Sequence, residues 1–108
     1  MASLNRWHAN FVFGTAACVI ALTGTVQAPA QTRPQYLGVC ADCHGYNGIG
    51  RYTEIPNIAG QDYYYMRKQL DNFLSGARRH YDMEKNADRF SDRILNDILD
   101  YYSRLSPR

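Results

Sequence analysis

Three residues that could do chemistry together lie within five positions of the chain. Cys40-Ala41-Asp42-Cys43-His44 reads C-x-x-C-H, the signature for attachment of a c-type haem. On a helical turn, two thiols three residues apart can reach the two vinyl groups of one porphyrin and form thioethers. The imidazole at the next position then lies beneath the iron. The motif therefore predicts one covalently attached haem c, with Cys40 and Cys43 as its thioether residues and His44 as the proximal iron ligand.

Two other kinds of protein use a C-x-x-C sequence. Thiol–disulfide motifs follow a strand in a βαβ setting, and this sequence predicts no such strand. A zinc site needs two further Cys or His ligands, but after residue 30 only His80 lies outside the motif. Both cysteines of that part of the chain lie inside the motif. Haem attachment is therefore the interpretation that the sequence favours.

The first thirty residues have the pattern of a secretory signal peptide. A short basic front precedes an uncharged apolar run over residues 11–22, and Ala28-Pro29-Ala30 supplies a small-x-small cleavage site. The apolar run is shorter than the roughly 20 residues that a spanning helix needs, so we expect cleavage after Ala30. An uncleaved membrane anchor and lipidation of Cys18 are the alternatives. Cleavage predicts export to the periplasm and one domain over residues 31–108.

Composition limits what this domain can be. A chain of 108 residues with a formal charge of +2 has room for one domain and no strong attraction to nucleic acid. Domains of this size are marginally stable without a cross-link or other staple. The two cysteines of the motif are too close in sequence to supply one, which points to a bulky apolar guest in the core.

Three helical patterns and long loops predict an all-α fold. The first pattern begins at Pro34, carries the C-x-x-C-H motif and ends at Gly45. The second covers residues 61–79, and the third runs from an N-cap at Ser91 until Pro107. Each has apolar residues at helical spacing. The intervening residues 46–58 and 80–90 are expected to be loops.

The order of these segments resembles class I c-type cytochromes. The resemblance rests on CADCHGYNGIG, PNIAGQ, YMRKQLDNFLSGARR and FSDRILNDILDYYSRL, and it covers roughly residues 36–105. The short bacterial mono-haem cytochromes, and single halves of the di-haem ones, are the most similar. The resemblance implies the small cytochrome c fold, with three main helices and long loops wrapped around one haem.

The resemblance also implies roles for two further residues. Met83 precedes Phe90 in the expected loop, as the family's distal methionine precedes its last helix, and is expected to be the second axial ligand. The Pro56 carbonyl is expected to bind the other ring nitrogen of His44, although Pro56 could be only a rigid loop corner. Met66 and His80 are the other candidates for the sixth position. Met66 fits better as a core residue of a helical stripe, and His80 as part of a solvated basic cluster.

These ligands imply an electron carrier. With His44 and Met83 on the iron, no position is open for a substrate, so we expect a non-enzymatic protein that exchanges electrons with redox protein partners. Two alternatives stay open. Polar residues around Met83 could leave the sixth position labile and able to bind small ligands, and the chain could be a haem subunit of a periplasmic dehydrogenase complex.

Overall fold

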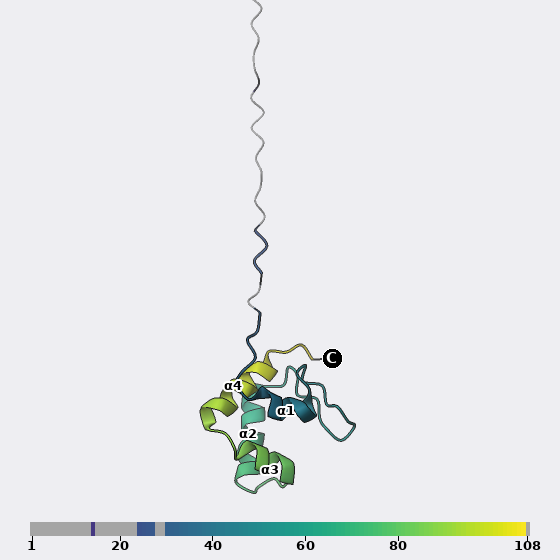
Figure 1. The fold of residues 1–108 in the computed structure, drawn as a ribbon, viewed down its shortest axis with the longest axis vertical. Coiled ribbons are helices and arrows are strands. Elements are labelled where there is room, and N and C mark those ends of the chain that lie inside the picture. The colour runs from purple at the N-terminus through teal and green to yellow at the C-terminus, as the bar shows by residue number, and fades with distance from the viewer. Residues whose placement is uncertain (1–13, 15–23, 28–29, 108) are drawn as a thin grey trace, which may run out of the picture.

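All regular secondary structure in the described part of the chain is α-helical. The computed structural model describes residues 14, 24–27 and 30–107. These residues form no β-strand and four helices (Figure 1), which are α1 (Leu37–His44), α2 (Tyr63–Leu74), α3 (Tyr81–Ala87) and α4 (Asp92–Ser103). The all-α prediction is confirmed, and a fourth, shorter helix accompanies the three main helices that the sequence predicts.

The additional helix is α3, in a segment that the sequence predicts to be a loop. The backbone N–H of its N-cap, His80, donates to Glu84 Oε1 at 3.0 Å. Asp82 and Glu84 also place negative charge in the first turn, where it opposes the positive end of the helix dipole. The segment has charge complementarity and no apolar stripe, so a search for hydrophobic periodicity misses it. Met83 consequently lies in a helix and not in a loop.

Helix α1 is shorter than the sequence predicts. Pro34 is not its first residue: the Pro34 carbonyl accepts from Leu37 N at 3.3 Å in a turn that precedes the helix. Tyr36, at the N-cap, has φ 66° and is the only non-glycine residue with positive φ among the described residues. The helix ends as predicted at Gly45, whose N–H donates to the Ala41 carbonyl at 2.8 Å.

The other two predicted helices are present with altered ends. The Asp62 carboxylate caps α2 by accepting from Tyr65 N at 2.8 Å. Helix α2 stops at Leu74, before the predicted Arg79, because the chain turns at Gly76 with φ 78°. Ser91 is the N-cap of α4 as predicted, although its side chain makes no capping hydrogen bond.

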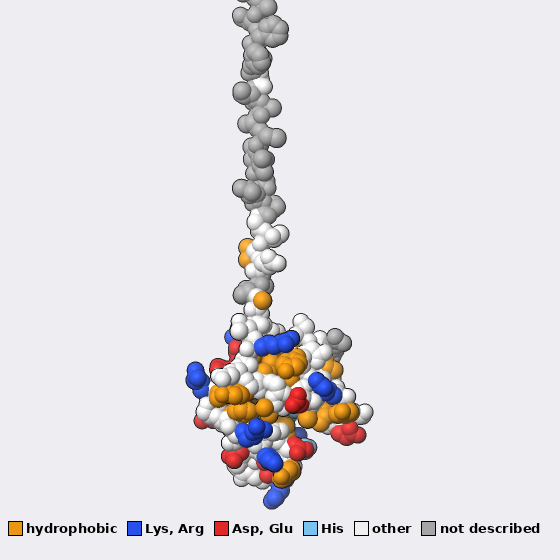
Figure 2. Space-filling view, in the orientation of Figure 1, with side chains coloured by type: hydrophobic (Ala, Val, Ile, Leu, Met, Phe, Trp, Pro, Cys, Tyr) orange, Lys and Arg blue, Asp and Glu red, His pale blue; other side chains and the backbone are white. Residues whose placement is uncertain are grey.

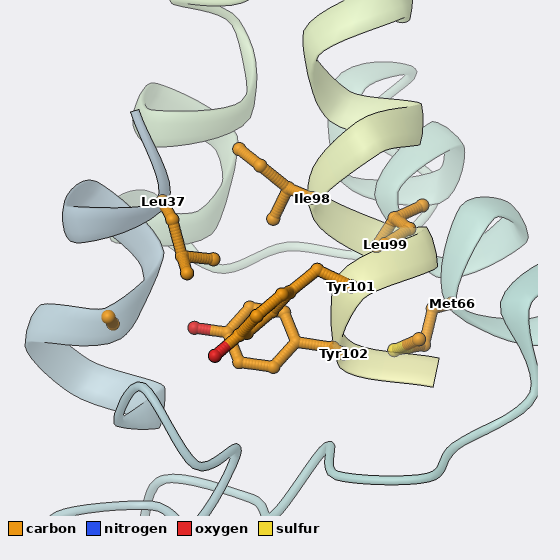
Figure 3. Close-up of a cluster of buried hydrophobic side chains, with 7 residues drawn as sticks. Leu37, Met66, Ile98, Leu99, Tyr101 and Tyr102 are labelled. Carbon is orange, nitrogen blue, oxygen red and sulfur yellow. The ribbon is translucent and has the colours of Figure 1, made fainter. Parts of the chain in front are cut away.

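The core joins α1, α2 and α4. In Figure 3 the rings of Tyr101 and Tyr102 from α4 lie between Leu37 of α1 and Met66 of α2. Tyr102 is fully buried in this cluster. Helix α2 packs against both α3 and α4, so α3 is attached to the core through α2. The buried cluster consists of Leu37, Ala41, Met66, Ile98, Leu99, Tyr101 and Tyr102.

The predicted signal peptide lies almost wholly outside the described residues. The division of the chain at Ala30 therefore stays a prediction. Within the described ranges, none of the helices has the length and apolar character that crossing a membrane requires.

Candidate haem-attachment site

Helix α1 presents two free thiols on one turn. Cys40 and Cys43 are three residues apart within the helix and form no disulfide. Cys40 is half-buried and packs against the core cluster, whereas Cys43 is exposed. The two cysteines thus have the separation along the helix that is typical of haem c attachment.

The surroundings of Cys40 do not favour a metal thiolate. Burial, with a smaller contribution from Cys43, raises the pKa of Cys40 to about 11, so its sulfur is a neutral thiol at neutral pH. Cysteines that bind metal do so as thiolates, and their pKa is usually lowered. The described residues also contain no group of three or more Cys, His, Asp or Glu side chains that could hold a metal ion. A zinc site is therefore a poor explanation of this motif.

His44 is held in one orientation by a backbone carbonyl. Its Nδ1 lies 3.0 Å from Pro56 O, and since a carbonyl oxygen can only accept, Nδ1 carries the proton. In a neutral imidazole this leaves the Nε2 lone pair free to coordinate a metal. Burial lowers the pKa of His44, the hydrogen bond to Pro56 partly opposes that shift, and the charge of His80 lowers the pKa further. The side chain is 8% exposed.

The loop after α1 folds back on the helix and brings Pro56 to His44. Arg51 N donates to the carbonyl of Cys43 at 3.0 Å, and Ile58 N donates to that of Gly48 at 2.8 Å. The side chain of Asn57 bridges the loop by accepting from Gly50 N at 2.8 Å. The residues between the motif and α2 thus form an ordered loop without regular secondary structure, as the sequence predicts for 46–58.

Two tyrosines of α4 also hold this loop. Tyr102 OH donates to the Gly45 carbonyl at 3.0 Å, and Tyr101 OH donates to the Tyr46 carbonyl at 2.9 Å. In Figure 3 both hydroxyl groups point away from α4. From the sequence, these residues are only part of an apolar stripe. Nothing in the stripe indicates that their hydroxyls bind the backbone directly after the motif.

The candidates for the sixth ligand lie on different elements. Met83 is half-buried on the first turn of α3, and His80 is the exposed N-cap of the same helix. Met66 is 5% exposed within the core of α2. Met66 therefore has the packing role that its place in the stripe predicts, and the choice between Met83 and His80 is a choice within one helical turn.

The donor set suits a covalently attached haem. Two free thiols one turn apart can add to vinyl groups, and the adjacent imidazole has its Nε2 free because Nδ1 is already bonded. A bond from a backbone carbonyl to a metal-binding histidine fixes the tautomer and orientation of the ring. The residues present therefore fit haem c better than any of the alternative groups considered above.

Comparison with known proteins points to one group of relatives, although no family model matches the chain. Cytochrome c-554(548) of Halomonas halodenitrificans is 33% identical over 70 residues, which are 62% of this chain and 84% of that protein. Cytochrome c4 of Stutzerimonas stutzeri is 30% identical over 105 residues, or 87% of this chain.

A third relative has a name that describes its role. The thiosulfate dehydrogenase electron acceptor of Stutzerimonas stutzeri (strain A1501) is 42% identical over 60 residues, which are 55% of this chain. The matched regions span 28% of that acceptor and 50% of cytochrome c4. The chain thus corresponds to half or less of these two longer relatives.

Proposed function

Because this chain belongs to the class I c-type cytochromes, a family of haem-based electron-transfer proteins, we propose that it is a periplasmic, non-enzymatic carrier of single electrons. Its cofactor is haem c, and the iron of that group changes between two oxidation states when bound. In this proposal Cys40 and Cys43 hold the haem, and His44 and Met83 ligate its iron. The hydrogen bond between His44 Nδ1 and Pro56 O carries the proposal, since it leaves Nε2 prepared for a metal.

Each residue of the site has a distinct task in this proposal. Cys40 and Cys43 would hold the haem as thioethers, for which each S–H would add across a vinyl group, with sulfur on one vinyl carbon and hydrogen on the other. His44, oriented by Pro56, donates its Nε2 lone pair. Met83, on the first turn of α3, would supply the second ligand of the iron and so exclude substrates and water from it. A thioether in this position favours the reduced iron and gives a higher potential than a second imidazole does.

Absorption spectra of the oxidised holoprotein test the assignment of Met83. Wild type should show the weak far-red band of sulfur–iron ligation, and Met83→Ala should lose it. Met66→Leu is the matched control: this volume-conserving change in the core should leave the band in place. A wild-type spectrum without the band, or a band that Met66→Leu removes, would contradict the proposed ligand set.

A second candidate is a haem subunit that stays attached to a dehydrogenase. The relative named as an electron acceptor of thiosulfate dehydrogenase supports it, because that name makes a similar sequence the direct partner of a dehydrogenase. Size-exclusion chromatography of a native extract separates the two candidates. A free carrier elutes as a small protein, whereas a subunit co-elutes with a large complex that thiosulfate reduces.

A further inference from the structure

We propose that His80 is a reserve axial ligand, which takes the sixth coordination position when Met83 leaves it. The inference rests on the proposed function and deepens it. The start of α3 would then provide two ligands of different chemistry for one iron. The exchange breaks an iron–sulfur bond and forms an iron–nitrogen bond, and it transfers no electron.

The two side chains belong to the same turn of one helix. His80 is the N-cap of α3 and Met83 is the third residue after it, a separation at which helical side chains are neighbours. The backbone of His80 is extended, with φ −161° and ψ 110°. Its N–H is held by Glu84 Oε1 at 3.0 Å. Exchange therefore needs a rotation of the His80 side chain and a local shift of one turn.

His80 is exposed, which leaves room for that rotation. Its side chain makes no capping hydrogen bond, although this is the usual task of a polar N-cap residue. The ring instead lies edge-on to the buried Phe73, with 6.4 Å between the ring centroids.

Met83 is placed where its bond to iron would be easily broken. The side chain is only half-buried, and Asp82, Glu84 and Lys85 surround it in sequence with charge that attracts water. An imidazole is a good ligand for iron, so His80 would compete once the thioether is released. The resulting bis-histidine haem has a lower reduction potential than the Met/His form.

Three variants of the holoprotein test this inference by absorption spectroscopy and redox titration. Met83→Ala should lose the far-red band yet stay low-spin, bind no carbon monoxide, and titrate at a lower potential than wild type. Met83→Ala with His80→Ala should become high-spin and bind carbon monoxide. Met83→Ala with Arg79→Ala, which removes the neighbouring exposed side chain, should behave like Met83→Ala alone.

Two outcomes would overturn the inference: a high-spin Met83→Ala protein, or a low-spin double variant lacking both Met83 and His80. If Met83→Ala fails to fold around haem, Met83→Leu keeps the side-chain volume and gives the same comparison. The proposed function is tested separately, because its failure appears in wild type as a missing far-red band. A wild-type band together with a high-spin Met83→Ala contradicts only the role of His80.

Discussion

Two tyrosine hydroxyls hold the backbone that follows His44. Tyr102 is fully buried and donates to Gly45 O, while Tyr101 is 9% exposed and donates to Tyr46 O. Gly45 comes directly after His44, so the first of these bonds sets the position of the end of α1 relative to α4. The rings also pack on each other, with centroids 5.5 Å apart.

Tyr102→Phe should lower the free energy of unfolding by about 0.5–1.5 kcal/mol, the usual net contribution of one hydrogen bond. The cost should not be higher, because Gly45 O still accepts from Gly48 N at 3.2 Å. Tyr101→Phe is the matched control, and it should cost less because Tyr46 is exposed and water can replace the hydroxyl. Denaturant unfolding of the two holoproteins measures both values. A larger loss from Tyr101→Phe would show that the buried bond is not the important one.

The buried Tyr102 also predicts that the free energy of unfolding depends on pH in the alkaline range. Burial raises the pKa of Tyr102 above its ordinary value of 10.0, with smaller contributions from Cys40, Tyr101 and Tyr46. The unfolded chain therefore releases this proton first, and stability falls as the pH rises above 10.0. Tyr102→Phe lacks the proton, so the difference in unfolding free energy between wild type and variant should shrink above that pH. A difference that stays constant with pH would contradict the shift.

At the scale of elements, one arginine connects α2 to the start of α4. Arg67 Nη2 lies 2.8 Å from Asp71 Oδ1 and 2.7 Å from Asp92 Oδ1. Its Nη1 donates to Asn96 Oδ1 at 3.1 Å. Partial burial lowers the pKa of Arg67, but the two carboxylates outweigh that effect and raise it. A planar guanidinium presents five N–H donors in a fixed fork, whereas a lysine ammonium has three donors on a single nitrogen.

Arg67→Met should lower the free energy of unfolding by about 1 kcal/mol. That value is at the upper end for exposed ion pairs, because the Arg67 side chain is 21% exposed whereas that of Asp92 is 81% exposed. Arg104→Met removes an i,i+4 pair with Asp100 whose side chains are 65% and 49% exposed, and it should cost about 0.3–0.5 kcal/mol. Denaturant unfolding of both variants gives the comparison. Equal losses would mean that the link between α2 and α4 adds nothing beyond a surface pair.

The loop that carries Pro56 depends on a glycine for packing. A Cβ at Gly50 would collide with the backbone carbonyl of Ile55, while a Cβ at Gly76 meets no atom within 4 Å. Gly50→Ala should therefore open the loop and disturb the Pro56–His44 bond. Gly76→Ala should cost only the strain of its φ of 78°, about 1–2 kcal/mol. The reduction potential separates them: it should shift in Gly50→Ala and stay at the wild-type value in Gly76→Ala. The reverse pattern would contradict this account of the loop.

At the scale of the whole molecule, the sequence predicts most of what a repeating pattern can encode. Local rules predict the apolar stripes of α2 and α4, the N-cap at Ser91 and the end of α1 at Gly45. The C-x-x-C-H motif predicts covalent attachment of haem. Helix α3 has no stripe, so its charges and its capping bond were needed to recognise it. The contact between His44 and Pro56 joins residues 12 positions apart. Only the family resemblance predicted this contact, because hydrophobic periodicity does not indicate where a loop folds back onto a helix.

The visible surface carries charges of both signs and exposed apolar side chains. Figure 2 shows basic and acidic side chains interspersed on the visible face, with apolar patches between them. Large apolar side chains that stay exposed include Tyr52, Tyr64, Leu74 and Tyr81. A face of mixed charge provides no strong electrostatic steering. Recognition of a redox partner is then expected to depend little on ionic strength and more on apolar contact, as in brief encounters with small interfaces.

The haem is expected to form part of the core. The buried cluster contains only seven residues, and domains of this size usually need a further staple. Cys40→Ala with Cys43→Ala removes both thioethers, so this variant should lose covalent haem, most of its helical circular dichroism and its cooperative unfolding. Cys43→Ala alone is the control, because the remaining thioether at Cys40 keeps one covalent link and should preserve colour and helicity. A colourless double variant with wild-type helicity and cooperative unfolding would show that the chain folds without haem, and the haem would then have no structural role.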